Sequence, residues 1–292
     1  MPELPWAEGA DPPRFRIELA GTDPPEMQLL WAHNFPDPSG QSTLVCERTA
    51  TDYRLHFPSV ATVVAFADGK LRIHPESGAC MDSVRHILLD QALPRLLAQR
   101  GELVLHAALV ATSTGKALLL IGDSGRGKST LTGAFLASGR RVGTDDGAVV
   151  RISEGELVAV PTYTSLRLLT DSRAHFFAGV DAATLPAAGY GGKKRLPVPI
   201  GIDASRVEAI VLLDPPIADG ASPRLTRELP ASACMAMIRH GFQLDLSDTG
   251  NLQVLLAKAA EAAGLVPVYR LEYPRQFDAL PDVIALLEHE LG

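Results

Sequence analysis

The chain has 292 residues, of which 46% are hydrophobic and 21% are charged, so it can build one large globular domain or two small ones. Its net charge of −7 provides no excess of cations to release counterions from a nucleic acid or to hold an anionic membrane, and neither partner is expected. The acidic, proline-rich start and the lack of any run approaching about 18 apolar residues predict a cytoplasmic protein.

The N-terminal part of the chain carries short apolar runs separated by Pro, Gly and Asp turns. Residues 1–13 are predicted to be disordered, and residues 14–82 to form a small β-rich module. Asp68-Gly69 is flanked by strand-like sequence, which favours a two-residue hairpin turn and antiparallel meanders. Three roles stay open for this module: completing the fold, binding substrate, or driving assembly of a homo-oligomer.

A helix is predicted over residues 83–100, between this module and one larger domain at 101–292. Apolar residues such as Val84, Ile87 and Leu88 recur there at helical spacing. Pro94 should kink or split the helix, because it lacks a backbone N–H and its ring collides with the preceding turn.

The larger domain is predicted to be of the α/β class. GELVLHAALVAT (101–112) and ALLLIG (117–122) are interpreted as two buried strands, and a helix is expected from Lys128 to Ser138. Further strands are expected at RVGTDD, GAVVRI, ELVAV, SLRLL, VEAIVLLD and VPVYRLEY. Further helices are expected at 229–240, 252–263 and 280–291, where apolar residues follow a helical period.

The cysteines give little support for a disulfide framework or a zinc site. Cys46, Cys80 and Cys234 are odd in number, far apart, and without metal-ligand spacing. Structural, reduced thiols are expected.

A glycine-rich loop follows the ALLLI strand. Residues 122–129, GDSGRGKS, match the phosphate-loop pattern G-x-x-x-x-G-K-[ST] in full, between a strand-like and a helix-like segment. Lys128 should reach the β- and γ-phosphates of ATP, and the Ser129 hydroxyl should sit on Mg²⁺. The alternative, a turn that merely needs glycines, leaves the lysine and the serine unexplained. The residues expected to bind the nucleotide are Gly122, Asp123, Ser124, Gly125, Arg126, Gly127, Lys128, Ser129 and Thr130.

Two adjacent acids, Asp145 and Asp146, follow soon after the loop. On an extended segment their side chains would point to opposite sides, so one could face a metal ion and the other an incoming hydroxyl. The alternative is an ordinary Asp-Asp-Gly turn on the surface.

Together, the LVLH strand, the GDSGRGKS loop and the close DD pair resemble the catalytic domain of HPr kinase/phosphorylase and its smaller relatives, including kinases that tailor lasso peptides. The resemblance covers residues 101–200 best and implies a phosphoenolpyruvate-carboxykinase-like nucleotide fold. It also implies that Asp145 is the catalytic carboxylate, that Asp146 is a Mg²⁺ ligand, and that His106 lies near Asp145 and influences its protonation. Taken without the family, His106 is a lone polar residue in an apolar strand, which is more typical of a core histidine.

The chain departs from HPr kinases after the acids. The segment 161-PTYTSLRLLTDSR-173 lacks the glutamate that those enzymes carry there, which weakens HPr as a substrate and leaves the metal with fewer ligands. Arg167 is expected either to pair with an acid or to bind substrate, because an unpaired charge between leucines is costly. Lys193, Lys194 and Arg195 are placed in a flexible loop, as a cationic clamp or as solvated charges.

The leading hypothesis is an ATP-dependent kinase that phosphorylates a Ser or Thr hydroxyl of a peptide, protein or small molecule. Carboxykinase chemistry has less support, because the chain is short and has no lysine–histidine metal pair for an enolate. A non-catalytic nucleotide-binding regulator or scaffold of a peptide-modification system is the third option. Phosphorolysis, the reverse transfer to inorganic phosphate, also stays open.

Overall fold

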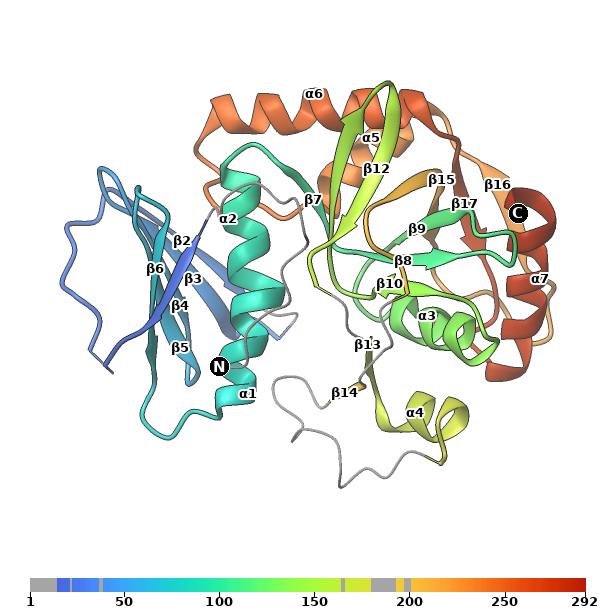
Figure 1. The fold of residues 1–292 in the computed structure, drawn as a ribbon, viewed down its shortest axis with the longest axis horizontal. Coiled ribbons are helices and arrows are strands. Elements are labelled where there is room, and N and C mark those ends of the chain that lie inside the picture. The colour runs from blue at the N-terminus through green and yellow to red at the C-terminus, as the bar shows by residue number, and fades with distance from the viewer. Residues whose placement is uncertain (1–14, 22, 37–38, 164–165, 180–192, 197–200) are drawn as a thin grey trace. The chain divides into compact units, whose positions relative to one another are not determined.

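The computed structural model describes residues 15–292 except 22, 37–38, 164–165, 180–192 and 197–200, and the chain divides into two compact units, residues 1–88 and 89–292 (Figure 1). The predicted disordered segment 1–13 lies outside the described residues. None of the helices in the described part combines the length and apolar character needed to cross a membrane.

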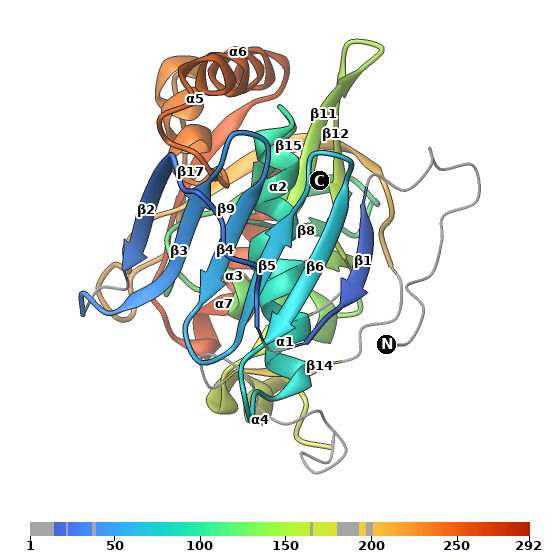
Figure 2. The same ribbon diagram turned by 90° about the vertical axis from the view of Figure 1, so that its left-hand side faces the viewer.

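The first unit is built around one six-stranded sheet, with strands in the order β1-β6-β5-β4-β3-β2 (Figure 2). Strands β2 to β6 pair antiparallel with their sequence neighbours, so the expected meander is confirmed, whereas β1 adds to the edge parallel to β6. Asp68-Gly69 turns the chain between β5 and β6, with Gly69 at a φ of +88°. The strands are β1 (Arg16–Leu19), β2 (Trp31–Pro36), β3 (Ser42–Arg48), β4 (Tyr53–Phe57), β5 (Ala61–Ala65) and β6 (Lys70–Pro75).

The predicted helix at 83–100 is present but irregular. Helix α1 (Met81–Ile87) runs through a π-helical stretch, Leu88–Ala92, into α2 (Leu93–Gln99). Pro94 lies in the first turn of α2, where its missing N–H is tolerated, so the irregularity falls just before the proline.

The second unit contains a nine-stranded sheet among its described residues, with the path β10-β8-β9-β15-β12-β11-β7 and with β17 and β16 continuing from β15. Its strands are β7 (Leu103–Leu105), β8 (Ala107–Ala111), β9 (Ala117–Ile121), β10 (Val142–Thr144), β11 (Ala148–Ser153), β12 (Glu156–Pro161), β15 (Ser205–Leu213), β16 (Arg224–Arg227) and β17 (Val268–Glu272). A separate ribbon pairs β13 (Leu166–Leu168) with β14 (Lys194–Leu196).

Four strands of this unit end at one edge of the sheet. Strands β9 and β17 run parallel to β15, and β10 has the direction of β9 because each pairs antiparallel with β8. The loops that follow β9, β10, β15 and β17 therefore leave the same edge, which is where α/β sheets commonly bind ligands.

Helices cover both faces of the central strands (Figure 1). Because successive side chains of β9 alternate, Leu118 and Leu120 pack with α3 (Lys128–Ala137) and α7 (Leu280–Leu291), whereas Leu119 and Ile121 pack with α5 (Pro230–Arg239) and α6 (Thr249–Leu265). This two-sided burial explains the unbroken apolar run of β9. Helix α4 (Thr170–Phe176) follows β13, and a short 3₁₀ helix, Phe277–Ala279, precedes α7. The α/β class is confirmed, and the carboxykinase-like topology stays a prediction.

Residues 101–112 do not form one strand as expected. The chain breaks at His106 into β7, which pairs with β11, and β8, which pairs with β9 and β10. The cause is a contact with a residue far along the chain: the backbone N–H of His106 donates to the carbonyl of His240 at 2.8 Å.

The three cysteines are free thiols. Cys46 and Cys234 are buried, as expected of structural cysteines, and Cys80 is exposed.

Candidate active site

The glycine loop joins the carboxyl end of β9 to helix α3. Gly125 and Gly127 have φ of +80° and +87°, a region that residues with a Cβ rarely adopt. A Cβ at Gly127 would also lie 2.9 Å from the Tyr273 hydroxyl. The predicted strand, loop and helix are confirmed, and they bring the loop amides and the amino end of α3 together as an anion-binding surface.

Lys128 opens helix α3 and is only 6% exposed. Its Nζ donates to the carbonyl of Gly122 and, at 3.4 Å, to the carbonyl of Asp123. Burial lowers the pKa of Lys128 to about 8, an effect that Asp146 opposes and Lys193 reinforces. At neutral pH the lysine therefore supplies a positive charge to the loop.

Asp145 and Asp146 follow β10 in a turn. The Thr144 Oγ1 accepts hydrogen bonds from the N–H groups of Asp146 (3.3 Å) and Gly147 (3.5 Å), which closes this turn. The expectation that the two carboxylates face opposite sides is wrong, because the turn replaces the pleat of a strand and both acids line one cavity beside the glycine loop. The alternative, a turn on the surface, correctly predicted a turn. It was wrong about the exposure, because Asp145 is 1% exposed and Asp146 is 9% exposed.

Asp145 has an environment suited to proton transfer. Its Oδ2 accepts a hydrogen bond from the Arg167 N–H at 2.9 Å, and its buried Oδ1 has no hydrogen-bond partner among the described residues. Burial and then the charge of Asp146 raise the pKa of Asp145 well above its ordinary value, against the opposing effects of the Arg167 N–H, Lys193 and Ser129. A raised carboxyl pKa is a common property of general bases that work near neutral pH.

Arg167 connects the two acids. Besides its backbone contact with Asp145, its Nη1 lies 3.8 Å from the Asp146 Oδ2, with both side chains nearly buried. The ion pair expected of Arg167 is present, and its contact with a substrate stays a prediction.

The acids and Ser129 fit a Mg²⁺ ion in the presence of nucleotide phosphates. The Asp145 Oδ1 and Asp146 Oδ2 are both buried without a hydrogen-bond partner in the described chain. Among the residues that the structure describes, no three His, Cys, Asp or Glu side chains form a metal cluster. Such a small oxygen set suits Mg²⁺, which usually takes one or two carboxylates and completes its shell with phosphates and water.

His106 holds the acid turn from the side. Its Nδ1 donates to the backbone carbonyl of Asp146 at 2.9 Å, which assigns the proton to Nδ1 because a carbonyl only accepts. Burial, reinforced by Lys128, lowers the pKa of His106 to about 4, so the ring is neutral at pH 7. His106 was expected to lie near Asp145, whereas this hydrogen bond is made with the neighbouring residue, Asp146.

Lys193 completes the cavity, which encloses about 230 Å³. Its Nζ donates to the Ser129 Oγ at 3.2 Å.

Lys194 and Arg195 do not lie in a flexible loop: they belong to β14, because their backbone pairs with β13 and places Arg195 opposite Arg167. Nothing about their side chains, or about residues 189–192, falls within the described part. Thr130, the last residue of the predicted nucleotide set, also lines the cavity.

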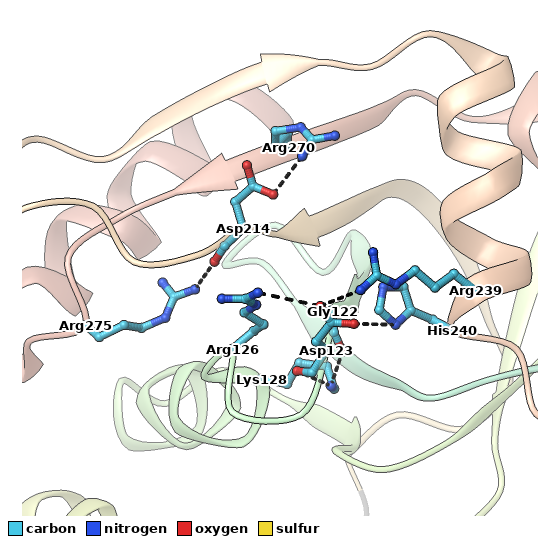
Figure 3. Close-up of polar contacts among 9 residues, drawn as sticks. All are labelled: Gly122, Asp123, Arg126, Lys128, Asp214, Arg239, His240, Arg270 and Arg275. Carbon is cyan, nitrogen blue, oxygen red and sulfur yellow. Dashed lines mark hydrogen bonds and ion pairs between the residues drawn. The ribbon is translucent and has the colours of Figure 1, made fainter. Parts of the chain in front are cut away.

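On the other side of the loop lie four arginines that were not predicted to gather there. Figure 3 shows Arg126 and Arg239 reaching Asp123, at 3.6 and 3.1 Å, and Arg270 and Arg275 reaching Asp214. Arg126, Arg239 and Arg270 line a cavity of about 470 Å³ whose other walls come from the glycine loop, the end of β15 and α5. Arg275 lines a different cavity. Their position along the chain was the available signal, because Asp214 directly follows β15 and Arg275 lies three residues after the end of β17.

Comparisons with known proteins show a weak structural likeness. No protein-family model matches the chain, and no curated protein matches it either. Among solved structures, the chain is similar to the HPr(Ser) kinase/phosphatase from Coxiella burnetii at 12% identity, with a TM-score of 0.34, over 64% of this chain and 95% of that one. At that identity and TM-score, the likeness assigns neither a fold family nor an activity.

Proposed function

We propose that this protein is an ATP-dependent kinase that transfers the γ-phosphoryl group to a Ser or Thr hydroxyl of a peptide, protein or small molecule. One observation carries the proposal: Lys128 of the glycine loop, the buried acids Asp145 and Asp146, and His106 line a single cavity. A loop that only bound nucleotide would have no need for two buried carboxylates beside its lysine, because burying like charges together is costly.

In the proposed reaction, the carboxylate of Asp145 takes the proton of the acceptor hydroxyl. The hydroxyl oxygen forms a bond to the γ-phosphorus as the bond from that phosphorus to the β–γ bridging oxygen breaks, which leaves ADP. Lys128 and Lys193 offset the negative charge of the phosphates. Arg167 and His106 act as positioning residues, since one contacts both acids and the other holds the backbone of Asp146.

Asp146 and the Ser129 hydroxyl would hold Mg²⁺, which when bound neutralises charge on the β- and γ-oxygens. Asp146 is suited to this, because its side chain lies beside the cavity and its buried Oδ2, 3.8 Å from the Arg167 Nη1, has no hydrogen-bond partner among the described residues.

A peptide acceptor is favoured by the resemblance of the loop and the acid pair to the smaller kinases that tailor lasso peptides. The acidic chain, at a net charge of −7, also gives no support for a nucleic acid as the acceptor.

The test is to incubate the protein with ATP and Mg²⁺ and a library of Ser- and Thr-containing peptides, and to follow gain of a phosphoryl group by mass spectrometry. Wild type should modify at least one class of hydroxyl, and Lys128→Ala should not. Tight ATP binding with no transfer to peptides, small alcohols or water would instead favour the nucleotide-binding regulator.

A further inference from the structure

A second cavity, of about 190 Å³, opens beside the glycine loop. It shares Gly125, Gly127 and Thr130 with the phosphate cavity, so the two are continuous along the loop and the first turn of α3. Its remaining wall comes from residues that follow β17 and from α4: Asp171, Ser172, Tyr273, Arg275, Gln276, Phe277 and Leu280.

The sheet order places this cavity opposite the acids. From β9, which carries the loop, the path leads through β8 to β10 and the acid turn in one direction, and through β15 to β17 in the other. A molecule whose terminal phosphate faced Asp145 would therefore extend its other end past Thr130 toward the residues after β17.

Tyr273 and Phe277, which line the second cavity, are aromatic, and Arg275 adds a planar guanidinium group. The Phe277 ring stacks on His175, with centroids 4.3 Å apart and planes 9° apart, and meets Phe176 edge-on at 5.7 Å. The Arg275 guanidinium lies 3.7 Å from the centre of the Tyr273 ring and is fixed by a 2.5 Å hydrogen bond to the Asp214 carbonyl, seen in Figure 3. Planar groups of this kind are the usual partners of nucleobase faces.

The same cavity also carries unused polar atoms. Tyr273 is 1% exposed, and neither its hydroxyl nor the Arg275 Nε has a hydrogen-bond partner in the described chain. Both atoms lie next to Gly127, within 3.3 Å of where a Cβ would stand. Gln276, which is exposed at the cavity, adds an amide that can both donate and accept.

We propose that this second cavity holds the base and ribose of the nucleotide whose phosphates occupy the glycine loop, with the base against Arg275 and Phe277. The inference rests on the proposed function and deepens it, because it makes a nucleoside triphosphate the donor in preference to pyrophosphate or another inorganic polyphosphate. The larger cavity by α5 suits a base less well: within the described chain neither Thr130 nor any Phe, Tyr or Trp lines it, and its arginines face Asp123 and Asp214.

The test compares ATP with inorganic tripolyphosphate, which has the same phosphates and no nucleoside. Titration calorimetry in Mg²⁺ should show wild type binding ATP at least about tenfold more tightly than tripolyphosphate, since stacking on aromatic or arginine faces is worth that much per base. Phe277→Ala and Arg275→Ala should each lose most of this preference while keeping the wild-type affinity for tripolyphosphate within about twofold. The exposed Arg224→Ala, on β16, should keep both affinities.

Retained tripolyphosphate binding also shows that each variant has folded. If a variant fails this check, it is replaced by Gln276→Ala at an exposed position, which should weaken the binding of ATP and leave that of tripolyphosphate unchanged. Equal affinity of wild type for ATP and tripolyphosphate, or an equal loss of both ligands in the variants, would overturn the base site and leave the phosphate site standing. Wild type that bound neither ligand would overturn the proposed function and this inference together.

Discussion

The two sides of the glycine loop differ in charge and in burial. On the β10 side, two carboxylates lie almost entirely inside the protein, at 1% and 9% exposure. On the β15 and β17 side, four arginines surround Asp123 and Asp214, and the Arg239 side chain is 70% exposed. Burial strengthens electrostatic effects and shifts pKa values, whereas exposed charges are screened by solvent and salt. Under the proposed function, we therefore expect the buried side to carry the chemistry and the exposed side to contribute mainly to ligand binding.

Among the substitutions that test this difference between the two sides, Asp145→Asn should have the largest effect on phosphoryl transfer. We expect transfer to fall by about 10³-fold, within the range of general-base contributions, while ATP affinity changes by less than about twofold. Calorimetry and a transfer assay check the two effects, with the exposed Asp219→Asn as the matched control. Full transfer activity in Asp145→Asn would remove Asp145 from the reaction.

The same variant should be more stable than wild type at neutral pH. Folding raises the pKa of Asp145, so the folded chain holds this proton more tightly, and stability is lost as pH rises from the unfolded toward the folded pKa. Asparagine avoids that cost and can still accept from the Arg167 N–H. A gain of about 1 kcal/mol, or roughly 2–4 °C in unfolding midpoint, is expected by thermal denaturation.

Lys128→Ala should weaken phosphate binding as a whole, because this residue lines the phosphate cavity and its Nζ contacts the carbonyl oxygens of Gly122 and Asp123 in the glycine loop. Loss of the buried ammonium group should weaken ATP and tripolyphosphate about equally, by about 10- to 100-fold, and reduce transfer with them. Equilibrium titration of both ligands measures this, and the exposed Lys116→Ala is the control. A change confined to ATP would place Lys128 at the nucleoside rather than at the phosphates.

The pH dependence of binding separates Lys128 from the arginines. Because its pKa is lowered to about 8, Lys128 loses its proton as pH rises from 7 to 9, whereas the arginines stay charged. Tripolyphosphate affinity should therefore fall by up to about tenfold over this interval in wild type. It should stay flat over the same interval in Lys128→Ala, and an equal slope in both proteins would contradict the assignment.

Arg239→Ala should have the smallest effect. Asp123 keeps Arg126 at 3.6 Å, and exposed ion pairs contribute little. We expect ATP affinity to weaken by no more than about threefold, with transfer from bound ATP unchanged in a single-turnover assay. A loss of transfer as large as that of Asp145→Asn would move the chemistry to the arginine side.

Local spacing predicted the parts of the site that lie close together in the sequence. The glycine loop, its strand and its helix all fall within residues 117–137, and the structure has them as expected. The hairpin at Asp68-Gly69 is another local feature, because the turn itself requires those residue types.

The parts that escaped prediction depend on distant residues. The break at His106 is set by the carbonyl of His240, and the acids meet the backbone and side chain of Arg167, more than twenty positions along the chain. The prediction that the two acids face opposite sides assumed an extended strand. It failed because the Thr144 side chain accepts a hydrogen bond from the N–H of Asp146 in place of strand pairing. The roles of Tyr273 and Arg275 emerge only when β17 is placed beside β15.

The contact of Lys128 with the carbonyls of Gly122 and Asp123 has a consequence for selectivity among anions. The ammonium group is already solvated by its own loop, so an incoming anion has to outcompete two carbonyl oxygens rather than bulk water. Chloride and other weakly coordinating ions gain little from such an exchange, whereas a polyphosphate engages the loop amides and the lysine together. We therefore expect the loop and Lys128 together to favour anions of high charge density.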